Sequence, residues 1–170
     1  DAAKLRDYNE NNHGLSGKEM IEAVKGAVAT NEVNAAMGII CATPTAGSSG
    51  TIPGVLFKLE KTHDLTEDQM IDFLFTSALF GRVVANNASV AGATGGCQAE
   101  VGSASAMAAA ASVAIFNGTP EQSGHAMALA ISNLLGLVCD PVAGLVEIPC
   151  VMRNAIGSGN ALISADLALA

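Results

Sequence analysis

The sequence is poor in aromatic residues: its 170 residues include no tryptophan, one tyrosine and five phenylalanines. Half of the residues are nonetheless hydrophobic. The interior must therefore be built largely from Ala, Val, Leu and Ile, whose small side chains allow helices to pack closely. Because a chain of this length can bury most of its apolar surface in one core, we expect residues 1–170 to form a single domain.

Basic residues are also scarce. Eight Lys and Arg stand against 16 Asp and Glu, which gives a net charge of −8. This excess of negative charge repels nucleic-acid phosphates and anionic lipid head groups, so we expect neither nucleic acid nor a membrane as a partner. The least polar stretch, residues 101–116, is too short to span the roughly 30 Å of hydrocarbon in a bilayer.

Cysteine is infrequent, with four residues in the chain, and no basic and apolar leader of the kind found in secreted proteins follows Asp1. We therefore expect a reducing, cytoplasmic location, in which the cysteines remain free thiols or bind metal. The start at Asp1 without a methionine suggests an excised piece of a longer chain.

Helix start signals recur along the sequence. In the pairs Ser16/Glu19, Thr66/Gln69 and Thr119/Gln122, each of the two side chains can satisfy one free backbone amide, the arrangement known as a capping box. Apolar residues follow at helical spacing, which predicts helices over 16–30, over 66–84 and from 119 onward. The polar residues 1–15 are predicted to be a loose lead-in.

No stretch shows the sustained period-two alternation that a half-buried strand requires. The sequence therefore predicts an all-α fold, a helical bundle with glycine-rich loops at the helix ends. These loops are expected within residues 43–54, 92–96, 136–144 and 156–160.

The first of these loops has the composition of an anion-binding site. Glycines at positions 47 and 50 let successive backbone amides turn toward one point, Ser48 and Ser49 add hydroxyl donors, and a helix expected to open near Ile52 adds its positive end. A carboxylate would suit such a site. The alternative is a plain surface loop, since Gly and Ser are ordinary loop residues.

Three cysteines are expected at helix ends beside Gly or Pro, namely Cys97, Cys139 and Cys150. A helix dipole and nearby backbone amides favour the ionised sulfur that a metal requires. No Cys-x-x-Cys pair occurs, so the spacing fits neither a compact zinc ribbon nor a bacterial ferredoxin. Buried and inert cysteine is the alternative interpretation.

Three long motifs make the sequence similar to a known family. The stretches CATPTAGSSGTIPG at 41–54, GATGGCQAEVGSA at 92–104 and CDPVAGLVEIPC at 139–150 closely resemble signatures of the α chain of iron-sulfur-dependent L-serine dehydratases. The resemblance continues through residues 153–155 and 158–161 and covers most of the chain.

The resemblance implies a specific chemistry. Cys97, Cys139 and Cys150 would hold a 4Fe-4S cluster, whose remaining iron would act as a Lewis acid on the hydroxyl of L-serine, giving pyruvate and ammonia without pyridoxal phosphate. Cys41 would head the substrate loop instead. The substrate-binding residues implied are Thr43, Thr45, Gly47, Ser48, Ser49, Gly50 and Arg153. A smaller β domain or β chain and a homo-oligomer would complete the enzyme. No residue of this chain is identified as the catalytic base, which can lie outside it, because the β part of the family packs near the active site.

Several other polar residues are candidates for orienting the substrate or simply for capping helices: Asn34, Gln98, Asn154 and Asn160. His63 is expected to be solvated and His125 to have no catalytic role. Two other classes of function stay open from the residues alone. One is a helical solute-binding or transport module with glycine-broken helices. The other is a structural zinc site with His63 or His125 as a fourth ligand.

Overall fold

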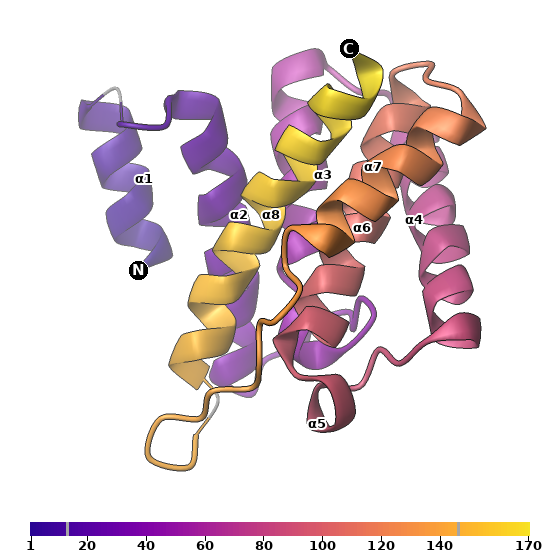
Figure 1. Ribbon diagram of the computed structural model, residues 1–170. Coiled ribbons are helices and arrows are strands. Elements are labelled where there is room, and N and C mark those ends of the chain that lie inside the picture. The colour runs from indigo at the N-terminus through magenta and orange to yellow at the C-terminus, as the bar shows by residue number, and fades with distance from the viewer. Residues whose placement is uncertain (13, 146) are drawn as a thin grey trace.

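The computed structural model describes residues 1–12, 14–145 and 147–170, and within these ranges it is built from helices without any β-strand (Figure 1). The elements are α1 (Ala2–Asn11), α2 (Lys18–Ala35), the 3-10 helix η1 (Ala46–Ser48), α3 (Thr51–His63), α4 (Glu67–Asn87), α5 (Gly92–Gly95), α6 (Cys97–Ile115), α7 (Pro120–Ser132) and α8 (Glu147–Leu169). One isolated bridge joins Val142 to Leu145. The all-α prediction is confirmed, but the loop expected within residues 156–160 was wrong, because these residues lie inside α8.

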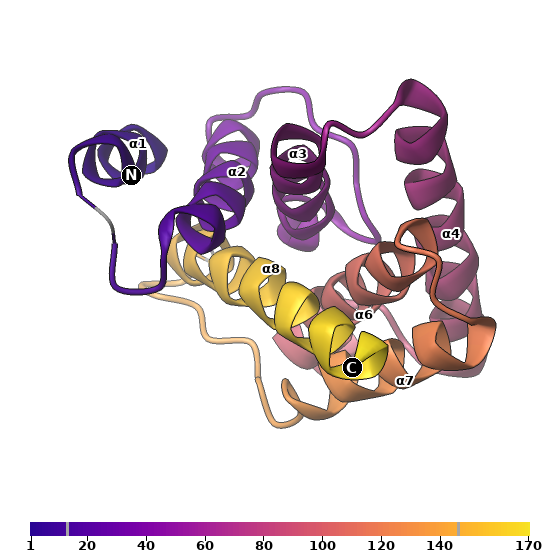
Figure 2. The ribbon, with the colours of Figure 1, turned by 90° about the horizontal axis from the view of Figure 1, so that it is seen from above.

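Helix α6 forms the centre of the bundle. Its segment from Ala104 to Ala111, which is Ala or Ser except for Met107, is buried on every side, because α3, α4, α7 and α8 all pack against it. Figure 2 shows α4 and α7 at one edge of the molecule and α2 and α3 side by side toward the other. Side chains this small let helix axes approach closely, which is how a chain with few aromatic residues fills its core.

Two of the three expected capping boxes are present. The Thr66 and Thr119 side chains accept from the backbone amides of Gln69 and Gln122, and the glutamine side chains accept in return from the backbone amides of the threonines. The prediction of a capping box at Ser16 was wrong. Helix α2 begins only at Lys18, after Gly17 with a φ of 85°, and its first turn has no side-chain cap.

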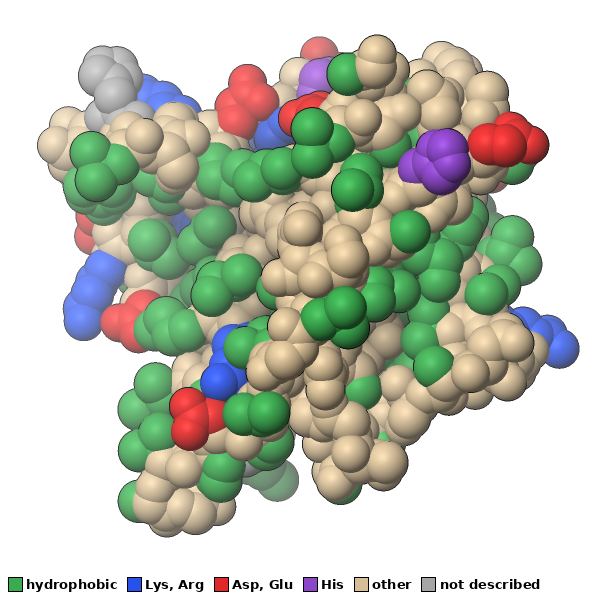
Figure 3. Space-filling model, viewed as in Figure 1, with side chains coloured by type: hydrophobic (Ala, Val, Ile, Leu, Met, Phe, Trp, Pro, Cys, Tyr) green, Lys and Arg blue, Asp and Glu red, His purple; other side chains and the backbone are tan. Residues whose placement is uncertain are grey.

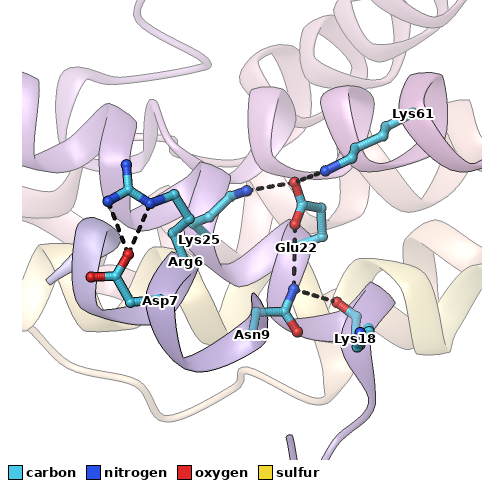
Figure 4. A network of polar contacts seen from close by, with 7 residues as sticks. All are labelled: Arg6, Asp7, Asn9, Lys18, Glu22, Lys25 and Lys61. Carbon is cyan, nitrogen blue, oxygen red and sulfur yellow. Dashed lines mark hydrogen bonds and ion pairs between the residues drawn. The ribbon is translucent and has the colours of Figure 1, made fainter. Parts of the chain in front are cut away.

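The predicted loose lead-in at 1–15 was also wrong over 2–11, which form α1 packed against α2. Polar contacts hold this helix: the buried Asn9 donates through Nδ2 to the carbonyl of Lys18 at 3.1 Å and to Glu22 Oε2 at 3.4 Å. Glu22 Oε1 in turn accepts from Lys25 at 2.5 Å and from Lys61 at 2.9 Å (Figure 4). One carboxylate thus joins α1, α2 and α3.

The chain brings several helix ends together at one end of the bundle. The segments that meet there lie below the long helices in Figure 1. They are the last turn of α2, the loop 41–50 with η1, the short α5, and the first turns of α6 and α8. The loop between α7 and α8 projects from the same end. Among the described helices, none combines the length and apolar composition needed to cross a bilayer.

Candidate active site

A cavity of about 540 Å³ opens where these helix ends meet. Cys97, Cys139 and Cys150 all line it, although 53 residues separate the first from the last in sequence. The other lining residues are Asn31, Asn34, Ala35, Met37, Ala46, Gly47, Gly92, Ala93, Glu100 and Glu147. Cys41 is exposed and is not among them. Three thiols therefore share one space, beside two carboxylates and two amides.

The Cys97 and Cys139 segments are joined through the backbone. Gly96 has a φ of +72°, and a Cβ there would lie 2.8 Å from the Cys139 amide nitrogen and 3.1 Å from the Leu137 carbonyl oxygen. The Gln98 amide donates to that Leu137 carbonyl at 2.7 Å, and the Gln98 side chain accepts from the Gly136 amide at 2.8 Å. Only glycine fits such a left-handed and crowded position without strain.

Arg153 links the same segments from α8. Its Nη1 lies 3.0 Å from Cys97 Sγ and 2.6 Å from the carbonyl oxygen of Val138, and its Nη2 lies 3.4 Å from an oxygen of Asp140. Its side chain is only 14% exposed. Arg153, predicted as a substrate ligand, therefore contacts a thiol and the loop that carries Cys139.

Cys150 lies one turn into α8 and is half-buried. Burial, and after it the neighbouring Cys97, Glu100 and Cys139, together raise the pKa of its thiol to about 11, against a smaller lowering effect of Arg153. A cation in the cavity would reverse this effect, because it stabilises a thiolate. The donor set therefore fits a positively charged centre.

The spacing of these donors bears on the kind of centre. Over the residues that the structure describes, no three His, Cys, Asp or Glu side chains are grouped closely enough to hold one metal ion. Neither His63, whose ring lies edge-on to Phe116 at 4.8 Å between centroids, nor the exposed His125 lines the cavity. A centre of several metal atoms tolerates wider spacing than a single zinc ion, because each thiolate binds a different metal atom.

Several polar groups of the loop 41–50 form hydrogen bonds with other groups of the same loop. Ser48 is fully buried, its amide donates to the Thr45 carbonyl and its hydroxyl to the Thr43 carbonyl, and the Ser49 amide donates to the Ala46 carbonyl. Of the predicted substrate-binding residues in this loop, Gly47 lines the cavity, whereas Thr43, Thr45, Ser48, Ser49 and Gly50 do not.

Asn154 secures this loop to α8. Its fully buried side chain accepts through Oδ1 from the amides of Gly50 and Thr51, at 3.1 and 3.0 Å, and from the Thr51 hydroxyl. Its Nδ2 donates to the carbonyls of Gly47 and Cys150, at 2.7 and 2.8 Å. The amides that open α3 are thus capped from within the protein.

The remaining sequence candidates divide between the site and the core. Asn34 lines the cavity and donates to the Ala46 carbonyl at 3.2 Å. Asn160 lies elsewhere, between the Ser105 hydroxyl and the Ala130 carbonyl. Sequence reasoning missed Glu100, which follows Cys97 by three residues and so shares its helix face. It also missed Asn31, one helical turn before Asn34.

The segment that leads into α8 is partly apolar. Val138, Val142, Leu145 and Ile148 are all more than half exposed along the loop before α8 and its first turn. Figure 3 shows hydrophobic side chains gathered on this projecting part of the molecule, whereas charged side chains lie mostly elsewhere on the same face.

The fold and the cavity together define an all-α domain that gathers cysteine thiols at one end of its helices. The chain belongs to the serine dehydratase alpha chain family, whose profile matches residues 1–170. It is 65% identical over 170 residues to the probable L-serine dehydratase alpha chain of Bacillus subtilis. It is 69% identical over 151 residues to that of Latilactobacillus sakei and 49% identical over 169 residues to the L-serine dehydratase alpha chain of Peptoniphilus asaccharolyticus.

These matches cover 100%, 89% and 99% of the chain, in the same order, but only 57%, 72% and 58% of the relatives. The chain thus spans little more than half the length of two of them. The family resemblance predicted from the three motifs is confirmed.

Proposed function

We propose that this chain is the cluster-binding part of an L-serine dehydratase, which eliminates water from L-serine and releases pyruvate and ammonia. One observation carries the proposal: in a member of the serine dehydratase alpha chain family, thiols from three separate segments line one cavity. The relatives are named alpha chains, so a β chain or domain would complete the enzyme. A reducing cytoplasm is the fitting location for its free thiols.

Cys97, Cys139 and Cys150 would hold a 4Fe-4S cluster, with three protein thiolates for four irons. When bound, the cluster supplies a Lewis acid for the leaving hydroxyl. Arg153 would help to hold the Cys97 side chain toward the cluster through its contact with Sγ. Gln98 and Gly96 hold the loop that carries Cys139, and Asn154 fixes the backbone at Cys150 and Gly47.

The protein's own residues shape the place for serine. Gly47 exposes backbone to the cavity, and the amides of Asn31 and Asn34 lie on its α2 side. Preorganised neutral donors of this kind orient a carboxylate and thereby the α proton and the hydroxyl of the substrate. We expect the base that takes the α proton to come from the β part.

Metal analysis of cysteine variants tests the proposal. In the full-length chain with its β part, prepared and reconstituted without oxygen, Cys97→Ala, Cys139→Ala and Cys150→Ala should each lose most bound iron and acid-labile sulfide. They should also lose more than about 100-fold in serine turnover. Cys41→Ala is the matched control for metal content, because Cys41 is exposed outside the cavity. Zinc without sulfide, or undiminished iron in all three variants, would contradict the proposal.

A further inference from the structure

Glu100 places a carboxylate in the wall of the cavity, with one oxygen held by the protein and the other free. The Thr45 hydroxyl donates to Oε1 at 2.8 Å. No group of the described residues donates to Oε2, and this atom is not one of the enclosed side-chain atoms that lack a partner. Oε2 of this half-buried residue is therefore an acceptor that a ligand in the cavity can reach.

Two glycines show on which side the carboxylate lies. Gly47 of η1 and Gly92 of α5 both line the cavity. A Cβ added to Gly47 would lie 3.1 Å from Oε2 of Glu100, and a Cβ added to Gly92 would overlap the same carboxylate. The carboxylate thus lies between two segments of the cavity wall, and a side chain at either glycine would crowd it.

The cavity offers this carboxylate no positive side chain. None of the described residues that line it is Lys, Arg or His, whereas Glu100, Glu147 and three cysteines are among them. Arg153, which contacts Cys97, forms its ion pair with Asp140 instead. A partly buried carboxylate loses hydration without gaining a countercharge, and a cationic ligand would offset that loss. The lining therefore favours a positively charged group and repels an anionic one.

We infer that Glu100 binds the ammonium group of the amino-acid substrate, with Oε2 as the acceptor. The inference rests on the proposed function and deepens it, because it assigns a recognition group on α6 to one end of the substrate. Glu100 follows Cys97 by three residues and so lies on the same face of α6. The ammonium and the hydroxyl of L-serine are on adjacent carbons, so a carboxylate in this position can hold the ammonium while the hydroxyl points toward the cysteines.

Removing the charge from the residue and the amino group from the ligand tests the contact. Glu100→Gln keeps the size of the side chain and an oxygen that can accept from Thr45. The variant is made in the full-length enzyme with its β part and a reconstituted cluster, and its iron and sulfide content is compared with that of the wild type. L-alanine serves as an inhibitor with the ammonium group, and 3-hydroxypropionate, which is L-serine without its amino group, as an inhibitor that lacks it.

The two inhibitors should respond differently. We expect the KM for L-serine and the Ki for L-alanine to rise about 10- to 100-fold, the range for a hydrogen bond between charged groups. The Ki for 3-hydroxypropionate should stay the same or fall, because the variant removes a negative charge that repels its carboxylate. Glu100→Asp keeps the charge on a shorter side chain and should bind L-alanine more tightly than Glu100→Gln.

This pattern separates substrate binding from folding and from proton transfer. A structural defect weakens both inhibitors alike, whereas loss of a catalytic base lowers kcat by about 100-fold or more and leaves the Ki for L-alanine unchanged. Glu60→Gln is the matched control for net charge, since Glu60 is exposed on α3 and does not line the cavity. It should leave the KM and both Ki values unchanged.

Two results overturn the inference: an unchanged Ki for L-alanine in Glu100→Gln, or equal losses for L-alanine and 3-hydroxypropionate. Failure of the proposed function itself looks different, because the wild-type enzyme would then not dehydrate serine. Calorimetric titration of L-alanine into the wild type and the two Glu100 variants would still test the ammonium contact in that case.

Discussion

At the scale of single residues, the site depends most on Asn154. One buried amide serves five partners, two through Nδ2 and three through Oδ1, and so joins η1, the start of α3 and the start of α8. Such a side chain can be replaced only by leaving several buried backbone groups without partners, and each of these costs about 1–3 kcal/mol.

We therefore predict that Asn154→Ala lowers the free energy of unfolding by about 3 kcal/mol or more, measured by urea denaturation. Asn87→Ala is the control, because Asn87 is exposed and donates only to a carbonyl of its own helix. It should change stability by less than about 0.5 kcal/mol. A loss below about 1 kcal/mol at Asn154 would mean that these contacts do not hold the loop to α8.

At the scale of elements, the turn between α5 and α6 determines how the Cys97 and Cys139 segments meet. Gly96 is both left-handed and in close approach to the α7–α8 loop. We predict that Gly96→Ala destabilises the fold by about 2 kcal/mol or more, because the added Cβ meets backbone atoms that cannot move independently. Thermal unfolding monitored by circular dichroism measures the change.

Gly124→Ala provides the comparison, since Gly124 lies within α7 with nothing within 4 Å of an added Cβ. Alanine is the better helix former, so this variant should gain about 0.5–1 kcal/mol. Equal effects at the two glycines would show that backbone conformation and close approach do not distinguish Gly96.

The elements also show which local signals are sufficient. Thr66 and Thr119 could be identified as helix starts because each forms its cap with a glutamine three residues away. Helix α1 could not, because its attachment depends on Asn9 reaching Lys18 and Glu22 on another helix. Periodicity reports a buried apolar face, and a helix held by a buried amide and ion pairs has little of one.

At the scale of the whole molecule, the three cysteines could be identified from the sequence, but the residues that surround them in the fold could not. The motifs indicate Cys97, Cys139 and Cys150 through resemblance, whereas their shared cavity results from how α6, α7 and α8 pack. The role of Asn154 toward Gly50 spans 104 residues, and no local pattern encodes it. For the same reason the expected anion site could be predicted only in part, because the amides of Gly50 and Thr51 donate to the distant Asn154 side chain.

The ion pairs of Glu22 extend across three helices and make stability depend on pH. Burial raises the pKa of Glu22, but hydrogen bonds and charge from Lys25 and Lys61 outweigh it, so the net pKa is below its ordinary value of 4.5. A carboxyl whose pKa is lower in the folded state stabilises the fold above its unfolded pKa, and this contribution disappears as the pH falls through the folded pKa.

We predict that Glu22→Gln lowers the free energy of unfolding at pH 7 by about 1 kcal/mol, the upper range for partly exposed ion pairs. The difference from wild type should stay constant down to about pH 5 and shrink steadily below pH 4.5. Urea denaturation at a series of pH values measures it. Glu60→Gln is the control, because Glu60 is exposed and makes no ion pair among the described residues, so its curve should follow that of the wild type. A Glu22 difference that persists at pH 3 would assign its contribution to packing, because protonation removes the charge but leaves the side chain in place.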